Sequence, residues 1–210
     1  METKGLVITG IGTDVGKTIV SAIVAQALGY DYWKPVQAGD LDYSDTMKVG
    51  KLTQGIVCLP ERYRLTVPAS PHHAANMDQL SISPNDFPLP TTDRPLLIEG
   101  AGGVMVPFNN KGLLFADLME QWKLPVIVVS RHYLGSINHT LLTLEVLKSR
   151  KIDVAGIVFV GDENGATESI VLHKTGVRVI ARIPFADELN QQFVQEQALL
   201  IAPTLKQIVI

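Results

Sequence analysis

The chain has 210 residues, of which 46% are hydrophobic and 19% are charged, and its formal net charge at pH 7 is −3. This length and composition predict one domain, residues 1–210, with a sizeable hydrophobic core. The slightly acidic balance offers no basic surface for a nucleic acid. No apolar run approaches the roughly 20 residues that a membrane span needs. We therefore expect neither a nucleic acid nor a membrane as partner.

Two further features bear on the cellular compartment. Residues 1–5 lead directly into an apolar run, which leaves no room for a signal peptide. Cys58 is the sole cysteine, so the sequence has no disulfide framework, as in a reducing cytoplasm. We expect a cytoplasmic protein in which Cys58 is a small core residue and not a nucleophile.

Apolar runs alternate with helical patterns along the chain. Strands are expected at 6–9, 30–34, 96–98, 126–129, 154–160 and 177–183, and helices at 17–28, 44–53, 113–122, 136–150, 166–174 and, more loosely, 190–200. This alternation predicts an α/β fold, a mostly parallel central sheet with helices on both faces, whose ligands bind beyond the carboxyl ends of the strands. Residues 60–95 hold most of the prolines and are expected to form a long irregular excursion with a short helix near 74–80. Loops of that length are more often functional than idle.

The first expected strand leads into Gly10-Ile-Gly-Thr-Asp-Val-Gly-Lys-Thr18, which opens the first expected helix. Glycines let backbone N–H groups turn toward an anion, and the start of a helix adds partial positive charge. Lys17 adds a full charge, and the Thr18 hydroxyl is a typical Mg²⁺ ligand. Five residues separate Gly10 from Gly16, where the common motif has four. The alternative is a glycine turn that only starts a helix, but the strand and helix around it favour a nucleotide-phosphate site.

Charged residues follow the second and third expected strands. Lys34 ends the second strand at the same sheet edge as the glycine loop, and it is either a ligand-binding lysine or an ordinary solvated one. Asp45 belongs either to the site or to a helix cap, for which Ser44 is another candidate. Glu99 ends the third strand and is followed by Gly100-Ala-Gly-Gly103. A buried glutamate needs a cation or donors nearby, and we favour a role as metal ligand over a structural ion pair.

The fourth expected strand leads to a helix for which Ser136 is the expected N-cap. The N–H groups at such a helix start can hold a carboxylate, although the pattern taken alone indicates only packing. His72, His73 and His139 lack metal-ligand spacing and a nearby Ser or Cys partner in the sequence. Capping, turn or surface roles are expected for these three histidines.

Taken together, these motifs resemble the ATP-dependent dethiobiotin synthetase family. The matching blocks are Ile8–Thr18, Lys34–Gly39, Pro68–His72, Glu99–Pro107, Leu134–Thr143 and Ile183–Phe185. They lie in the family's order and span nearly the whole chain, and the longer spacing of the glycine loop is also similar to the family's own version. The resemblance implies a P-loop NTPase fold of the Rossmann-like three-layer type and a homodimeric cyclo-ligase.

The reaction that the resemblance implies closes a cyclic urea on 7,8-diaminononanoate. One amine takes up CO₂, supplied as bicarbonate, to give a carbamate; ATP phosphorylates the carbamate; and the second amine closes the ring of dethiobiotin and releases phosphate. Such chemistry depends on positioning and on neutralising negative charge. Lys17 and Lys34 are the implied catalytic residues.

The resemblance also implies a set of contacts. Nucleotide contacts are expected at Asp14, Val15, Gly16, Lys17, Thr18, Ile19, Asp45, Glu99, Gly100, Ala101, Gly102, Pro184 and Phe185. The implied Mg²⁺ ligands are Thr18, Asp45 and Glu99. The implied substrate contacts are Thr13, Lys34 and Ala38, together with Gly135, Ser136, Ile137 and Asn138 from the second subunit.

Two positions depart from the family. Ala38 stands where the family often has a Ser or Thr, so that contact is made by backbone or lost. Val160 stands where the family typically has an asparagine that reads the adenine base. Because valine neither donates nor accepts, we expect relaxed nucleotide choice, with Asn164 or the backbone near 184–185 as the substitute.

Two other classes of protein are alternatives. An amidoligase of the cobyrinate diamide synthase type needs a glutaminase domain, and this chain has neither the length nor a suitable cysteine. A nucleotide-switched binding ATPase of the ParA or MinD kind usually has a second lysine early in the loop, where this chain has Ile11 and Gly12. Such proteins act on DNA or membranes, and no basic patch or basic amphipathic helix is visible here.

Overall fold

The computed structural model describes residues 5–208 and has a seven-stranded main sheet. The strands are β1 (Gly5–Gly10), β2 (Asp31–Trp33), β4 (Cys58–Leu59), β6 (Leu96–Gly103), β7 (Val126–Arg131), β8 (Val154–Val160) and β9 (Val179–Ile183), in the spatial order β4-β2-β6-β1-β7-β8-β9. All neighbouring strands pair in parallel. A small second sheet pairs β3 (Val36–Ala38) with β5 (Tyr63–Leu65), also in parallel.

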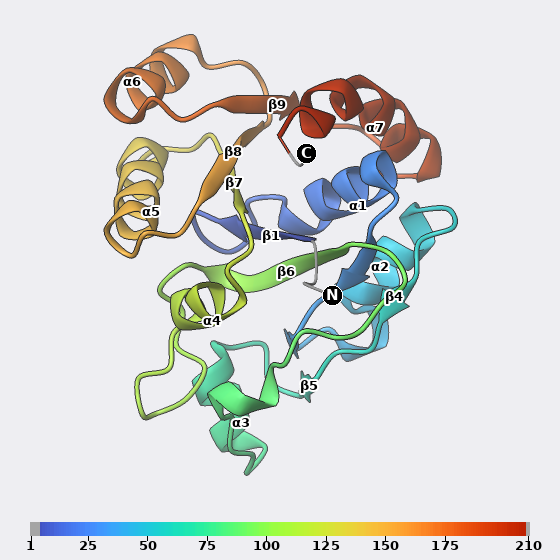
Figure 1. The fold of residues 1–210 in the computed structure, drawn as a ribbon, viewed down its shortest axis with the longest axis vertical. Helices are drawn as coiled ribbons and strands as arrows, with labels where there is room; N and C mark the ends of the chain where they lie inside the picture. Colours follow the sequence, from blue (N-terminus) through green and yellow to red (C-terminus); the bar gives the residue numbers. More distant parts are fainter. Residues whose placement is uncertain (1–4, 209–210) are drawn as a thin grey trace.

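Helices cover both faces of the main sheet (Figure 1). On one side lie α1 (Lys17–Leu28), α2 (Asp45–Leu52) and α7 (Gln191–Lys206), and on the other lie α4 (Phe115–Trp122), α5 (Ser136–Ser149) and α6 (Gly165–Thr175). The helix α1 packs against both of its neighbours. This is the three-layer α/β arrangement that the alternating pattern predicts.

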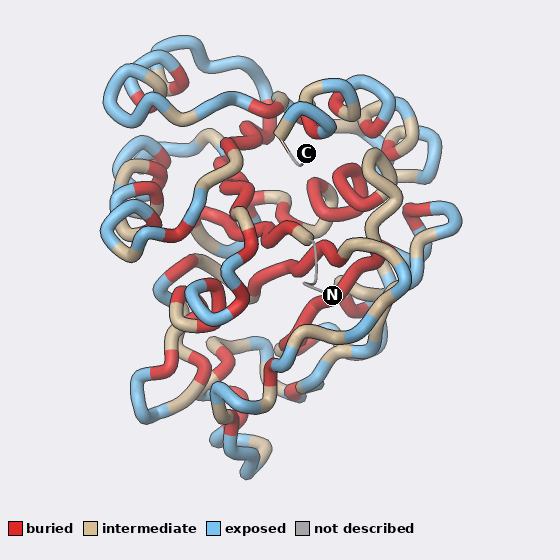
Figure 2. The backbone as a smooth tube through the Cα atoms, in the orientation of Figure 1, coloured by how far each residue is buried: buried red, intermediate tan, exposed pale blue. Residues whose placement is uncertain are grey.

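The core lies along the central strands and the inner helix faces (Figure 2). Residues 6–8 of β1 and 126–129 of β7 have no exposed surface, as expected for parallel strands that are covered on both faces and therefore apolar at every position. None of the helices in residues 5–208 is long and apolar enough to cross a membrane.

The excursion at 60–95 is partly regular. It contains β5, the helix α3 (Pro71–Met77) and a 3₁₀ turn at Pro84–Asp86. The helix starts three residues before the expected position because Pro71 takes its first turn, where a missing N–H costs nothing. The strands β3, β4 and β5 were not predicted, since two or three residues are too few to show a pattern.

Other element bounds differ at the ends. The strand β6 continues five residues past its expected end, through a glycine-rich stretch that lacks an apolar pattern, and Gly103 still pairs with Gly10. The helix α7 extends beyond residue 200 and includes Pro203. Cys58 is half-buried on β4 and packs against the core. Burial raises the pKa of its thiol to about 11, which supports the expectation that it is not a nucleophile.

Candidate active site

The glycine loop joins the carboxyl end of β1 to the start of α1. Gly16, the residue before α1, has a φ of +94°, a conformation that glycine adopts far more readily than other residues. At Gly10 a Cβ would lie 2.6 Å from Cγ2 of Val15, so the loop closes on itself there. The Nζ of Lys17 donates to the carbonyl oxygen of Gly12 at 2.8 Å. Burial lowers the pKa of Lys17, an effect that Glu99 only partly opposes.

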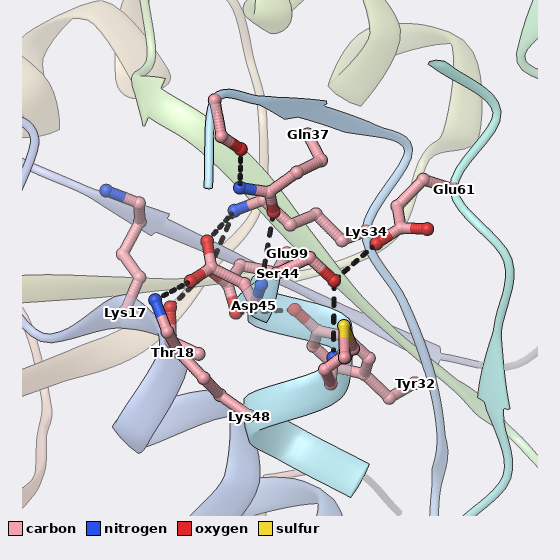
Figure 3. Close-up of polar contacts among 12 residues, drawn as sticks. Lys17, Thr18, Tyr32, Lys34, Gln37, Ser44, Asp45, Lys48, Glu61 and Glu99 are labelled. Carbon is pink, nitrogen blue, oxygen red and sulfur yellow. Dashed lines mark hydrogen bonds and ion pairs between the residues drawn. The ribbon is translucent and has the colours of Figure 1, made fainter. Parts of the chain in front are cut away.

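Glu99 lies on β6 beside this loop and has no exposed surface. Its Oε1 accepts hydrogen bonds from the hydroxyl of Thr18 at 3.0 Å and from Nζ of Lys34 at 3.1 Å. Its Oε2 accepts from the hydroxyl of Tyr32 at 2.9 Å (Figure 3). Both oxygens of this buried carboxylate are therefore satisfied, as burial of a charge requires.

Lys34 lies between two carboxylates (Figure 3). Its Nζ is 2.6 Å from Oδ2 of Asp45 and 3.1 Å from Oε1 of Glu99, and its side chain is 6% exposed. Burial disfavours its charge, but the two carboxylates outweigh that effect and raise the pKa of Lys34. The interpretation as an ordinary solvated lysine is therefore wrong.

Asp45 belongs to the same charge cluster. The N-cap of α2 is Ser44, whose Oγ accepts from the backbone N–H of Met47, so the capping alternative for Asp45 is wrong. Burial opposes the charge of Asp45, and Lys34 outweighs burial and lowers its pKa. Its other oxygen is 3.3 Å from Nζ of Lys48, and its backbone N–H donates to Oε1 of Gln37 at 3.2 Å.

A cavity of about 790 Å³ opens over this cluster. The predicted site residues that line it are Thr13, Asp14, Gly16, Lys17, Thr18, Ile19, Lys34, Ala38, Asp45, Glu99, Ala101 and Gly102. Residues that sequence reasoning missed also line it: Val36, Gln37, Asp40, Lys48, Val106 and 68–71. The spacing of Lys48 from Asp45 by three residues, on one helix face, was a signal that could have found it.

Several predicted site residues lie outside this cavity lining. Val15 is buried against the loop, and a Cβ at Gly100 would lie 2.2 Å from the ring of Phe115, so this glycine faces the core. Pro184 and Phe185 also lie outside the lining, as does the start of α5 at 135–138.

Phe185 belongs to a surface next to the glycine loop, beyond the cavity. Its half-exposed ring lies 5.1 Å from the guanidinium of Arg131, which donates to the carbonyl oxygen of Asp14 at 3.2 Å. Val160 ends β8 beside the loop, because a Cβ at Gly16 would lie 3.2 Å from its Cγ1. The side chain of Asn164 caps α6 by accepting from the backbone N–H of Thr167.

The start of α5 differs from the expectation by one residue. The cap position belongs to Gly135, with a φ of +101°, and Ser136 is the buried first residue of the helix. Ser136 as N-cap is therefore wrong. Leu134, just before Gly135, is fully exposed, and Ile137 is partly exposed.

The histidines for which turn or surface roles were expected make local contacts or lie at the surface. Nδ1 of His72 lies 3.0 Å from the hydroxyl of Ser70, and Nδ1 of His139 lies 2.8 Å from the hydroxyl of Tyr133. His73 is exposed on α3. The expectation that His72 has no serine partner nearby in the sequence is therefore wrong, because Ser70 lies two residues before it. The local contacts still fit the turn and surface roles expected from the sequence.

The oxygen atoms beside the cavity fit a magnesium ion. Thr18 offers a hydroxyl, and Asp45 and Glu99 offer carboxylates, which are the hard ligands that Mg²⁺ prefers. Thr18 and Glu99 touch, and Lys34 joins Glu99 to Asp45. Oxygen donors of this kind next to the lysine of a glycine loop are chemically suited to Mg²⁺ and nucleotide phosphates.

Solved structures with a similar fold support the fold class. The chain aligns with the septum site-determining protein MinD of Pyrococcus horikoshii, complexed with Mg-ADP, over 99% of this chain and 93% of that one, with a TM-score of 0.58 and 14% identity. It aligns with a putative plasmid partition protein of Borrelia burgdorferi bound to AMPPNP over 98% of both chains, with a TM-score of 0.58 and 10% identity. At such low identity, these likenesses show the fold alone.

Sequence comparisons are more specific. A family model described as an AAA domain matches residues 4–192. An ATP-dependent dethiobiotin synthetase of Christiangramia forsetii is 52% identical over 191 residues, which cover 89% of this chain and 91% of that protein. The protein of the same name from Afipia carboxidovorans is 50% identical and covers 88% of each chain. The chain therefore belongs to the dethiobiotin synthetase family, with the P-loop fold that its glycine loop predicts.

Proposed function

We propose that this protein is an ATP-dependent dethiobiotin synthetase that closes a cyclic urea on 7,8-diaminononanoate. The observation that supports this most directly is the charge cluster of Lys34, Asp45 and Glu99 on the wall of the cavity that Lys17 also lines. The names of the relatives at about half identity agree with it.

The proposed reaction has three steps. One amine of the substrate adds to CO₂ and loses a proton, which gives a carbamate. A carbamate oxygen attacks the γ-phosphorus of ATP, and ADP leaves. The second amine attacks the carbonyl carbon of the mixed anhydride, loses a proton and expels phosphate, which leaves the cyclic urea.

The residues of the cluster have matching tasks. Lys17 and the N–H groups of the glycine loop hold the phosphates, and Lys34 neutralises charge on the carbamate and the transferring phosphoryl group. Because the charge of Lys34 is fixed by its two carboxylate partners, it needs no reorganisation during the reaction. Thr18, Asp45 and Glu99 would hold Mg²⁺, which when bound supplies positive charge to the phosphates.

The proposal extends to the choice of nucleotide. Val160 offers no hydrogen-bonding group beside the loop, and the side chain of Asn164 is engaged in capping α6. The exposed ring of Phe185, with Arg131 beside it, offers a stacking surface that does not distinguish bases. Weak selection among nucleoside triphosphates is the consequence.

A homodimer with the substrate site at its interface is also part of the proposal. The start of α5 lies outside the cavity lining and presents Leu134 with a fully exposed side chain. Leu134→Asp is expected to give a monomer by light scattering and to raise KM for the diamine more than tenfold. Leu199→Asp, at the 77% exposed Leu199 of α7, is the matched control. A dimeric Leu134→Asp protein with unchanged KM would contradict this arrangement.

The function is tested by phosphate release from Mg-ATP with and without the diamine and bicarbonate. Release that requires both substrates and yields dethiobiotin supports the proposal, and Lys17→Ala is expected to abolish it. Release indifferent to the diamine would refute it. Stimulation by DNA or lipid would then indicate a switch ATPase, and a requirement for an amide nitrogen donor would indicate an amidoligase.

A further inference from the structure

Tyr32 is buried behind the site and does not line the cavity. It lies on β2, where it pairs in register with Leu97 of β6, so its side chain shares a face with those of Leu97 and Glu99. Two residues along a strand span about 6.6 Å, which the phenol ring bridges. Its hydroxyl thereby reaches Oε2 of Glu99 at 2.9 Å (Figure 3).

The two oxygens of Glu99 have different partners. Oε1 accepts from Thr18 and Lys34, both of which line the cavity. Within residues 5–208, Tyr32 is the one donor to Oε2. The tyrosine therefore fixes the plane of the carboxylate and keeps Oε1 on the side of the cavity.

Tyr32 is suited to donating this bond continuously. Its side chain is fully buried, so no solvent water competes for the proton of the hydroxyl. The tyrosine also lies within the sheet, between β4 and β6. A donor held by a parallel sheet has little freedom to move away.

We propose that Tyr32 is a positioning residue that holds the Glu99 carboxylate with Oε1 facing the nucleotide and its metal ion. The inference rests on the proposed role of Glu99 as a metal ligand. Mg²⁺ tolerates little departure from octahedral geometry. A donor on the oxygen turned away from the metal orients a ligating carboxylate, and losing such a donor typically lowers metal affinity about 10- to 100-fold.

The test removes the hydroxyl and keeps the ring. Tyr32→Phe is expected to weaken Mn²⁺ binding to the complex with a non-hydrolysable ATP analogue at least tenfold, by electron paramagnetic resonance titration. Nucleotide binding in EDTA is expected to stay within twofold of wild type. In turnover, half-saturation by Mg²⁺ rises by a similar factor, and saturating Mg²⁺ restores much of kcat.

The matched control is Tyr63→Phe. The hydroxyl of Tyr63 donates to Oδ2 of Asp86 at 2.7 Å, outside the cavity lining, so this variant loses the same kind of bond and is expected to leave Mn²⁺ affinity unchanged. A second variant with 4-aminophenylalanine at position 32 retains an N–H donor at the same place. It is expected to restore metal affinity and remains informative if Tyr32→Phe folds poorly.

The contrary results are equally specific. If the folded Tyr32→Phe protein binds Mn²⁺ with wild-type affinity, whatever its melting temperature, Tyr32 is a packing residue and the inference is overturned. The inference is equally overturned if 4-aminophenylalanine at position 32 gives a folded protein that does not regain Mn²⁺ affinity. The Mn²⁺ titration contains no diamine. Failure of the ring-closing reaction in wild type would therefore refute the proposed function separately.

Discussion

The carboxyl edge of the sheet has two halves, and each contains a buried glutamate. On the β6 side, Glu99 bonds to Lys34, Thr18 and Tyr32 beside the cavity. On the β7–β9 side, Glu168 of α6 bonds to Arg182 and His132 outside the cavity lining.

The two glutamates show that burial and pairing alone do not mark a functional carboxylate. Glu99 is fully buried and Glu168 is 6% exposed, and both have a cationic partner. The difference lies in the partners. Those of Glu99 line a cavity and could turn toward a ligand, whereas Glu168 joins the end of β7, the start of α6 and β9 to one another. We therefore propose that Glu99 serves catalysis and that Glu168 serves the fold.

The largest expected effect is that of Glu99→Gln on turnover. This change keeps the shape of the side chain and removes the charge that helps to hold Lys34 and, in the proposed site, the metal ion. The expected loss in kcat is about 10²- to 10³-fold, measured as dethiobiotin formed at saturating substrates. Because Lys34 keeps its ion pair with Asp45, the protein is expected to fold. An active Glu99→Gln enzyme would refute the catalytic role.

Glu168→Gln is expected to reverse this pattern. Losing charged hydrogen bonds to Arg182 lowers the free energy of unfolding by about 2–3 kcal/mol, measured by urea denaturation, while kcat stays within about twofold. The control is Glu163→Gln. Glu163 is exposed and its ion pair with Arg182 is long, at 3.7 Å, so the pair contributes little to stability. A tenfold lower kcat in fully folded Glu168→Gln protein would contradict the structural role proposed for Glu168.

The stability that Glu168 contributes is expected to depend on pH. Burial opposes the charge of Glu168, and the bonds from Arg182 and His132 outweigh it and lower its pKa. A lowered folded-state pKa contributes stability that is present above the ordinary glutamate value of about 4.3 and is lost as pH falls through the folded value. The difference in unfolding free energy between wild type and Glu168→Gln is expected to be present at about pH 5 and above. It should shrink at lower pH, and a difference that grew there would contradict the assignment.

The sequence predicted the parts of the site that lie in local motifs. Lys17, Thr18 and Asp45 open helices, and Lys34 follows β2. Glu99 follows the apolar part of β6 and lies within that strand. Parallel strands bring their carboxyl ends to one edge. The central strands were predicted for the same reason, because burial on both faces makes them apolar throughout.

What the sequence did not predict depends on register and on distant packing. The sequence around Tyr32 gives no sign of a role, because only the register of Tyr32 with Leu97 places its hydroxyl beside Glu99. Gln37 accepts a hydrogen bond from the backbone N–H of Asp45, and it lies on β3, a strand too short to show an apolar pattern. The cap of α5 fell on Gly135 because a positive φ was needed there, which outweighed the preference for serine.

The smallest expected effect concerns Val160, which ends β8 and lies beside the glycine loop. Wild type is expected to have kcat/KM values for ATP and GTP within about tenfold of each other, because Val160 offers no hydrogen-bonding group beside the glycine loop. Val160→Asn introduces one reading group and is expected to shift the ratio toward ATP by about tenfold, or ~1.4 kcal/mol. Competition kinetics with both nucleotides measure this ratio. A wild-type preference for ATP of several orders of magnitude would overturn the expectation.

The most direct test of the central claim is an oxygen tracer. With ¹⁸O-labelled bicarbonate, 7,8-diaminononanoate and Mg-ATP, the carbamate oxygen that attacks ATP leaves with the phosphate. Mass spectrometry should find one ¹⁸O in the released phosphate and one in the urea carbonyl of dethiobiotin. Unlabelled phosphate would mean that water, and not a carbamate, attacks ATP, and it would contradict the assignment of this cavity to urea ring closure.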